Sequence, residues 1–263
     1  MSPVPEAFMG VWRRARITTP GLDDTTTRVF WVQGPSWYGD IRVPADSPRR
    51  AKGSGFAAYA EDELVALART ESFAGQLTVT PDECAWRRDL DYQPPARFPD
   101  VGGWRFTGPD TLIETGVHLP YEEVWLREPD SDGLFAAFRP EDGSGLLVIA
   151  GDHFLAIGGR AEGLPGGSDL ATLVREALGR GQRPLAESWL SMPSAYGRIA
   201  EGWRIVHSTQ PWREGGPLWS ERPGYEPASG RLTTSDGKTW LRAERLGDEV
   251  RLTRALGLEP CRA

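Results

Sequence analysis

The sequence predicts a mainly β protein in which two similar antiparallel β-barrels follow each other, each with one short α-helix. Three observations lead to this prediction. Short apolar or alternating runs recur along the chain, separated by turn sequences such as GPS, TPDE, VGG and GPD, a pattern typical of strands joined by turns. Glycine and proline are frequent, at 31 and 22 of the 263 residues. Four motifs of the first half also reappear in the second half, in the same order.

Strands are expected in the first half at 28–33, 38–43, 76–80, 84–92, 104–107, 112–115 and 122–127. Two segments predict helices instead. The segment 61–70 carries acidic residues in its first turn, where they oppose the helix dipole. In the segment 168–179, Ser168 can cap the first turn, leucine, valine and alanine recur at helical spacing, and Gly179 can end the helix.

The repeat rests on four ordered matches. They pair ELVALAR at 63–69 with DLATLVR at 169–175, Gly39-Asp40 with Gly151-Asp152, Trp86-Arg87 with Trp203-Arg204, and Trp125-Leu126-Arg127 with Trp240-Leu241-Arg242. The polar, turn-prone segment 127–133 separates the halves. We therefore expect a first barrel domain over 1–128 and a second over 129–263, and closure of each barrel would remove exposed edge strands.

Composition excludes several classes of function. The net charge of −7 argues against binding to nucleic acid or to an anionic membrane surface. No apolar run is long enough to span a bilayer, and the first residues do not resemble a signal peptide, so a soluble cytoplasmic protein is expected. The two cysteines, Cys84 and Cys261, form no metal motif, and no glycine pair fits a dinucleotide site. Neither a metal nor a cofactor is expected.

Three segments resemble a known family. LIETGVHLPYEEVW at 112–125, GLLVIAGDHFLAIGG at 145–159 and SDGKTW at 235–240 are similar to the fungal casein-kinase-interacting protein family. Gly10-Val11-Trp12 also looks like the GxW sequence that opens calycin barrels. The resemblance implies two calycin-like (lipocalin-like) barrels in one cytosolic chain and leaves room for a protein partner. It implies no catalytic residue, because that family offers none that is established.

Candidate catalytic residues follow from one strand. In 84–92, Cys84, Trp86, Arg88, Leu90 and Tyr92 alternate toward one side, which we expect to face the barrel interior. A buried guanidinium needs a carboxylate or an anionic ligand. The candidate partners of Arg88 are Asp40, Glu114 and Glu122. Glu114 could lie inside with a raised pKa, whereas the face taken by Asp40 and Arg42 stays open. The predicted catalytic set is Asp40, Arg88 and Glu114.

The favoured function is binding of a small apolar or aromatic acidic molecule in a barrel cavity, expected in the first unit, by a monomer or homodimer. The alternative is a cofactor-independent isomerase, cyclase or lyase using acid–base chemistry in the same cavity, and a third hypothesis is a protein-interaction module. His207 aligns with Leu90 and predicts a polar site inside the second barrel. The predicted ligand-binding residues are Trp31, Gln33, Arg42, Trp86, Tyr92, Glu122, Trp125 and His207.

Overall fold

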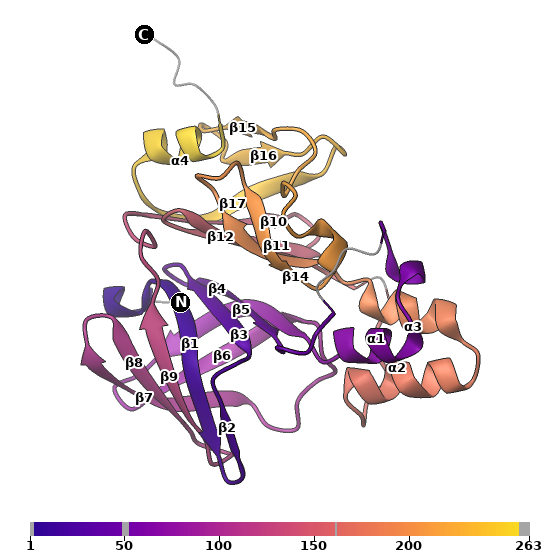
Figure 1. Ribbon diagram of the computed structural model, residues 1–263. Coiled ribbons are helices and arrows are strands. Elements are labelled where there is room, and N and C mark those ends of the chain that lie inside the picture. Colours follow the sequence, from indigo (N-terminus) through magenta and orange to yellow (C-terminus); the bar gives the residue numbers. More distant parts are fainter. Residues whose placement is uncertain (1–2, 49–52, 161, 258–263) are drawn as a thin grey trace.

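The computed structural model describes residues 3–48, 53–160 and 162–257, and Cys261 lies outside them. Two antiparallel β-sheets follow each other along the chain, and the helices α1 (Glu61–Leu67), α2 (Leu170–Gly179) and α3 (Arg183–Leu190) lie together at one side (Figure 1). Within the described residues, no helix is long and apolar enough to cross a membrane.

The first sheet closes into an eight-stranded barrel. β1 pairs with β3 on one side and with β9 on the other. The short β2 is an additional strand, which forms a hairpin with the last residues of β1. The closed antiparallel barrel predicted for the first half is therefore confirmed. Its strands are β1 (Gly10–Thr19), β2 (Leu22–Asp24), β3 (Arg28–Gln33), β4 (Trp37–Val43), β5 (Glu71–Val79), β6 (Glu83–Asp91), β7 (Asp100–Gly108), β8 (Thr111–Gly116) and β9 (Glu122–Arg127).

The second sheet has eight strands and, in the described part of the chain, stays open between β14 and β15. The segment 215–218 covers the free edge of β14, where Ile205 N–H donates to the carbonyl of Gly216 at 2.9 Å. The second half thus differs from the closed barrel that we predicted. Its strands are β10 (Leu134–Pro140), β11 (Gly145–Ala150), β12 (His153–Gly158), β13 (Ser194–Arg198), β14 (Arg204–Ser208), β15 (Gly224–Glu226), β16 (Arg231–Thr233) and β17 (Thr239–Gly247).

Both halves nevertheless use one strand order. β10–β17 follow each other in space as β1 and β3–β9 do, and the gap between β14 and β15 falls where β6 pairs with β7 in the barrel. The helices also correspond, since α1 lies between β4 and β5, whereas α2 and α3 lie between β12 and β13. Trp125 of β9 and Trp240 of β17 are equivalent, as the repeat predicted. Trp203 lies just before β14 with a φ of 57°, whereas Trp86 lies within β6.

The two sheets pack face to face. Phe30 on the outer face of β3 stacks on Tyr196 with ring centroids 4.3 Å apart, and the hydroxyls of Ser72 and Ser194 are hydrogen-bonded at 2.7 Å. Buried apolar residues run from the barrel interior through this interface. Outside the two sheets lie α4 (Glu249–Ala255) against the second sheet and three short 3-10 helices, η1 (Glu6–Phe8), η2 (Phe56–Ala58) and η3 (Pro211–Arg213).

Gly39 of β4 lies close to the side chain of Leu155 of β12, in the interface between the two sheets. A Cβ atom added there would lie 2.5 Å from Cδ2 of Leu155. We expect Gly39→Ala to lower the free energy of unfolding by about 1–3 kcal/mol, because the added methyl group overpacks the interface. Urea denaturation measures this, and Gly55→Ala is the control, because a Cβ at Gly55 meets nothing within 4 Å. Equal stability of the two variants would contradict the packing argument.

Candidate functional site

Most of the predicted site residues meet inside the first barrel. Trp31 packs edge-to-face against Trp86 and Trp125, at centroid distances of 5.6 and 5.8 Å. These rings fill the interior so completely that the remaining cavity measures about 10 Å³, room for one water molecule at most. Its lining contains six of the predicted residues and two that were not predicted: Trp31, Asp40, Arg42, Trp86, Glu114 and Trp125, with Phe73 and Asp100.

Asp40 lies inside the barrel, which settles the face that the sequence left open. Its carboxylate accepts from Arg42 Nε at 3.0 Å, and its side chain is only 4% exposed. Burial raises the pKa of Asp40 to about 6, against the opposing effect of Arg42. Glu123 stands nearby and accepts from Arg14 at 2.6 Å. The barrel interior is therefore a network of paired charges beneath the tryptophans.

Glu114 occupies the barrel interior, where both of its carboxyl oxygens accept hydrogen bonds. The hydroxyl of Tyr121 donates to Oε1 at 2.7 Å, and the indole N–H of Trp125 donates to Oε2 at 3.1 Å. Burial, with a smaller contribution from the charge of Glu123, holds the pKa of Glu114 well above its usual range. The inward position and raised pKa expected from the sequence are both present. The carboxyl satisfies the buried indole and leaves no space for a substrate beside it.

Arg88 is paired, as a buried guanidinium requires, but with other carboxylates than those predicted. It donates to Asp100 at 2.7 Å and to Asp91 at 3.1 Å, and it lies 3.5 Å from the ring centroid of Phe73. Asp40, Glu114 and Glu122 were the wrong partners. The register between β5 and β6 shifts after Arg88, so Asp91 faces inward where the simple alternation placed Leu90.

The same register shift explains Tyr92, which was predicted to line the barrel. Tyr92 lies beyond the shift, buried between the barrel and the helices, where its hydroxyl donates to the carbonyl of Leu190 at 3.4 Å. Glu122 is exposed on the outside of β9, and its neighbour Glu123 takes the inward place. Gln33 is buried near one end of the barrel and accepts from Trp31 Nε1 at 3.0 Å, away from the cavity.

His207 does not lie inside the second unit. Its ring stacks on Phe30 and on Tyr196, with centroids 5.4 and 6.4 Å apart, so it belongs to the interface between the sheets. Other residues of the charged network were missed by the sequence analysis. Arg14 lies in a run of arginines that reads as solvent-exposed, and Asp91 and Asp100 flank a proline-rich loop. The alternation of Tyr121, Glu123 and Trp125 is the one signal that could have identified Glu123.

A larger hollow, of about 330 Å³, lies in the second unit beside the gap between β14 and β15. Five cationic or hydroxyl residues are among those that line it: Arg213, Ser220, Thr234, Ser235 and Lys238. Arg213 donates to the carbonyl of Leu218 at 3.1 Å, and burial lowers its pKa. Within the described residues, no carboxylate lies within ion-pair distance of Arg213. The apolar part of the lining includes Leu147, Ala195, Leu218, Trp219, Leu232 and Trp240.

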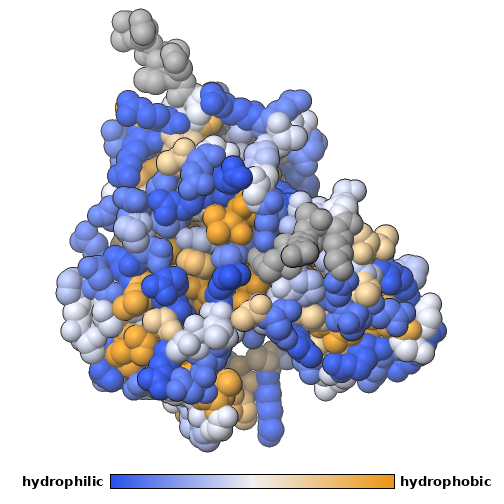
Figure 2. Space-filling model, in the orientation of Figure 1, coloured by the Kyte–Doolittle hydropathy of each residue, from blue (hydrophilic) through white to orange (hydrophobic). Residues whose placement is uncertain are grey.

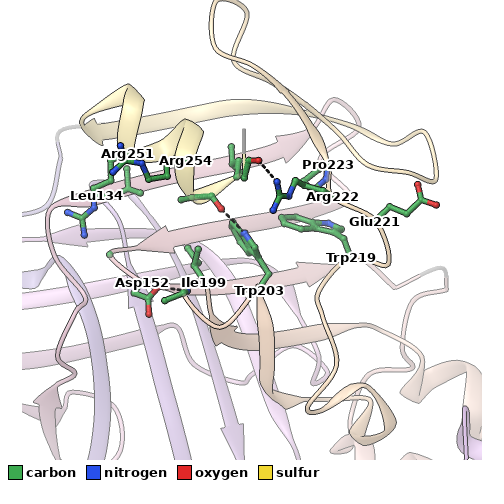
Figure 3. Close-up of a pocket in the computed structure, with 16 residues that line it drawn as sticks. Leu134, Asp152, Ile199, Trp203, Trp219, Glu221, Arg222, Pro223, Arg251 and Arg254 are labelled. Atoms are coloured by element: carbon green, nitrogen blue, oxygen red, sulfur yellow. Dashed lines mark hydrogen bonds between the residues drawn. The ribbon is translucent and has the colours of Figure 1, made fainter. Parts of the chain in front are cut away.

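Three other hollows have cations that are less available. The largest, of about 800 Å³, is lined by Arg69, which pairs with Asp46, by Arg97, which lies over the ring of Phe98, and by Arg88. Another, of about 610 Å³, lies at the barrel mouth beside Arg88 and Arg160. Arg88 is held by two aspartates there, and Arg160 donates to three backbone carbonyls. The third, of about 500 Å³, lies beneath α4. Its arginines do not converge, because Arg251 and Arg254 lie at one end and Arg222 at the other (Figure 3).

The visible outer surface offers no single large apolar face. Figure 2 shows apolar side chains on this side as several separate patches between hydrophilic ones. Among the described residues, no group of three or more histidine, cysteine, aspartate or glutamate side chains is placed to hold a metal ion. Comparison with protein-family models, with curated proteins and with solved structures finds no match. The site therefore has to be judged on its own geometry.

The pKa of Asp40 predicts a pH dependence of stability. A value of about 6 in the folded state exceeds the roughly 3.9 of an unfolded chain. The folded state thus binds more protons between these pH values, so Asp40 makes the free energy of unfolding fall as pH rises from about 4 to 6. In Asp40→Asn this fall should disappear, which amounts to at most about 3 kcal/mol.

Urea titrations at several pH values between 4 and 7 measure this effect. The control is Asp46→Asn, a surface carboxylate paired with the exposed Arg69, which should retain the wild-type dependence on pH. If Asp40→Asn showed the same fall in stability as wild type, Asp40 would not be buried as described.

Proposed function

We propose that the chain binds a small, largely apolar molecule with one acidic group, and that the ligand occupies the hollow of the second unit. The observation that supports this proposal is the difference in cavity volume between the two halves. The first barrel retains a cavity of about 10 Å³, whereas the second unit holds a hollow of about 330 Å³. Ligand cavities in proteins measure about 300–1,000 Å³ and are mostly apolar with a few polar groups, and the second hollow has this character.

The charges of the lining support an acidic ligand. Arg213 and Lys238 both line the hollow, and the one carboxylate among the lining residues is Asp236. Asp236 accepts from the hydroxyl of Thr234 and from the backbone N–H of Lys238. A half-buried guanidinium whose partner is a backbone carbonyl gains most from an incoming carboxylate, because such hydrogen bonds between charged groups are the strong ones.

This proposal moves the site from the first unit, which the sequence favoured, to the second. The catalytic alternative draws support from Asp40 and Glu114, two carboxyl groups that line one cavity with raised pKa values. That cavity has room for one water molecule at most. Acid–base chemistry on an organic substrate needs more space, so binding is the function that we propose.

Replacement of Arg213 tests the function. Isothermal titration with a panel of medium-chain fatty acids and arylalkanoic acids should detect binding to the wild-type chain. Arg213→Gln should weaken the affinity about tenfold or more, because a hydrogen bond to a charged group is worth about 1.5–3 kcal/mol. Arg213→Lys keeps the charge and should retain most of the affinity.

Arg180→Gln is the matched control, because Arg180 is exposed on α2 and pairs with Glu176. This variant should bind as wild type does. The proposal is wrong if no acid of the panel binds, or if Arg213→Gln binds as tightly as wild type.

A further inference from the structure

The two halves can be aligned residue by residue at their last hairpins. Leu112 lies opposite Trp125 in the barrel, and Leu232 lies opposite Trp240 in the second unit. Two residues further along the chain lie Glu114, on the same face of β8, and Thr234, one residue beyond the end of β16. The residues opposite them are Glu123 and Lys238, since Thr234 N–H donates to the carbonyl of Lys238 at 3.0 Å.

The equivalent indoles have different hydrogen bonding. Trp125 Nε1 donates to the carboxyl of Glu114 at 3.1 Å. Trp240 Nε1 is also buried, but no acceptor lies within hydrogen-bond distance of it in the described part of the chain. A buried donor without a partner costs about 1–3 kcal/mol and is rare in native proteins. Trp240 is also among the residues that line the hollow of the second unit.

Thr234 does not replace the lost carboxyl group. Its hydroxyl donates to the carboxylate of Asp236 and approaches the carbonyl of Lys238 at 3.2 Å, so it is engaged with its own turn. The exchange of Glu123 for Lys238 also reverses the charge on the opposite strand. The barrel thus supplies two carboxyl groups at these positions, whereas the second unit supplies none and adds a cation.

We infer that a carboxyl oxygen of the ligand accepts the hydrogen bond of Trp240 Nε1, in the position that the Glu114 side chain occupies in the first barrel. Trp240 is then a specificity-determining residue, and Lys238 and Arg213 favour the ionised form of the acid. The ligand class is a monocarboxylic acid with an apolar body. This inference rests on the proposed function and adds to it Trp240 as the residue that recognises the carboxylate of the ligand.

The experiment uses 4-phenylbutanoate as the probe, measured by isothermal titration. Trp240→Phe keeps an aromatic ring but removes the donor, and we expect it to weaken binding about tenfold. Trp219→Phe is the matched control, because Trp219 lines the same hollow and should lose no more than about threefold. 4-Phenylbutylammonium, which has the same body but a cationic group, should not bind.

A second pair of variants tests whether a side chain of the protein can supply the acceptor for Trp240 Nε1 in place of the ligand. Thr234→Gln introduces a side-chain carbonyl in place of the Glu114 carboxyl oxygen that accepts from Trp125, so it should supply the acceptor and weaken binding of the probe about tenfold. Thr233→Gln places the same amide on the exposed face of β16, outside the hollow, and should bind as wild type does. Thermal unfolding of each variant verifies that it is folded.

Indole N–H resonances separate the possible results. In ¹⁵N-labelled protein, the Nε1–H signal that disappears in Trp240→Phe should shift on addition of the probe, while the signal of Trp125 should not. If Trp240→Phe binds as tightly as wild type while Arg213→Gln loses affinity, the inference fails and the proposed function stands. If the wild-type chain does not bind the acid panel, both fail.

Discussion

The pairing of each half's last strand with its first strand organises the whole molecule. β9 pairs with β1, and β17 pairs with β10. In the first half this pairing completes a closed ring of strands, which places Arg14 beside Glu123 and brings Trp125 over the interior. In the second half the same pairing carries Trp240 to the equivalent place. Because both sheets follow the same strand order and pair their first and last strands alike, their interiors can be compared position by position.

The same strand order encloses two different interiors in the two halves. The first barrel fills its interior with tryptophans and with ionisable groups that pair with one another. Buried charges are tolerated there because each has a partner, and burial raises the pKa of Glu114. The second unit replaces Glu114 by Thr234 and Glu123 by Lys238, and its edge strands do not meet in the described residues. Its interior keeps the apolar wall and the indole but not the internal acceptor, which leaves a hollow of ligand size.

Sequence reasoning reached the strand pattern, the repeat and the closed first barrel because turns, alternation and tryptophans are local signals. It also brought together Trp31, Asp40, Arg42, Trp86, Glu114 and Trp125. The prediction of which side chains face inward failed where the strand register shifts. The shift after Arg88 places Tyr92 outside the barrel and Asp91 inside it. Alternation alone could not choose between Glu122 and Glu123. The open second sheet depends on strands of three residues, β15 and β16, which carry too little pattern to reveal whether they close a ring.

The lone indole of Trp240 has a consequence for the life of the protein in the cell. The buried Trp240 Nε1 has no acceptor among the described residues, which lowers the free energy of unfolding of the empty protein. A bound ligand stabilises the folded state by mass action. Differences of one or two kcal/mol are enough to change how much of a protein survives proteolysis. If the proposed acid binds, its supply would set the abundance of the protein, with loaded molecules persisting and empty ones being degraded first.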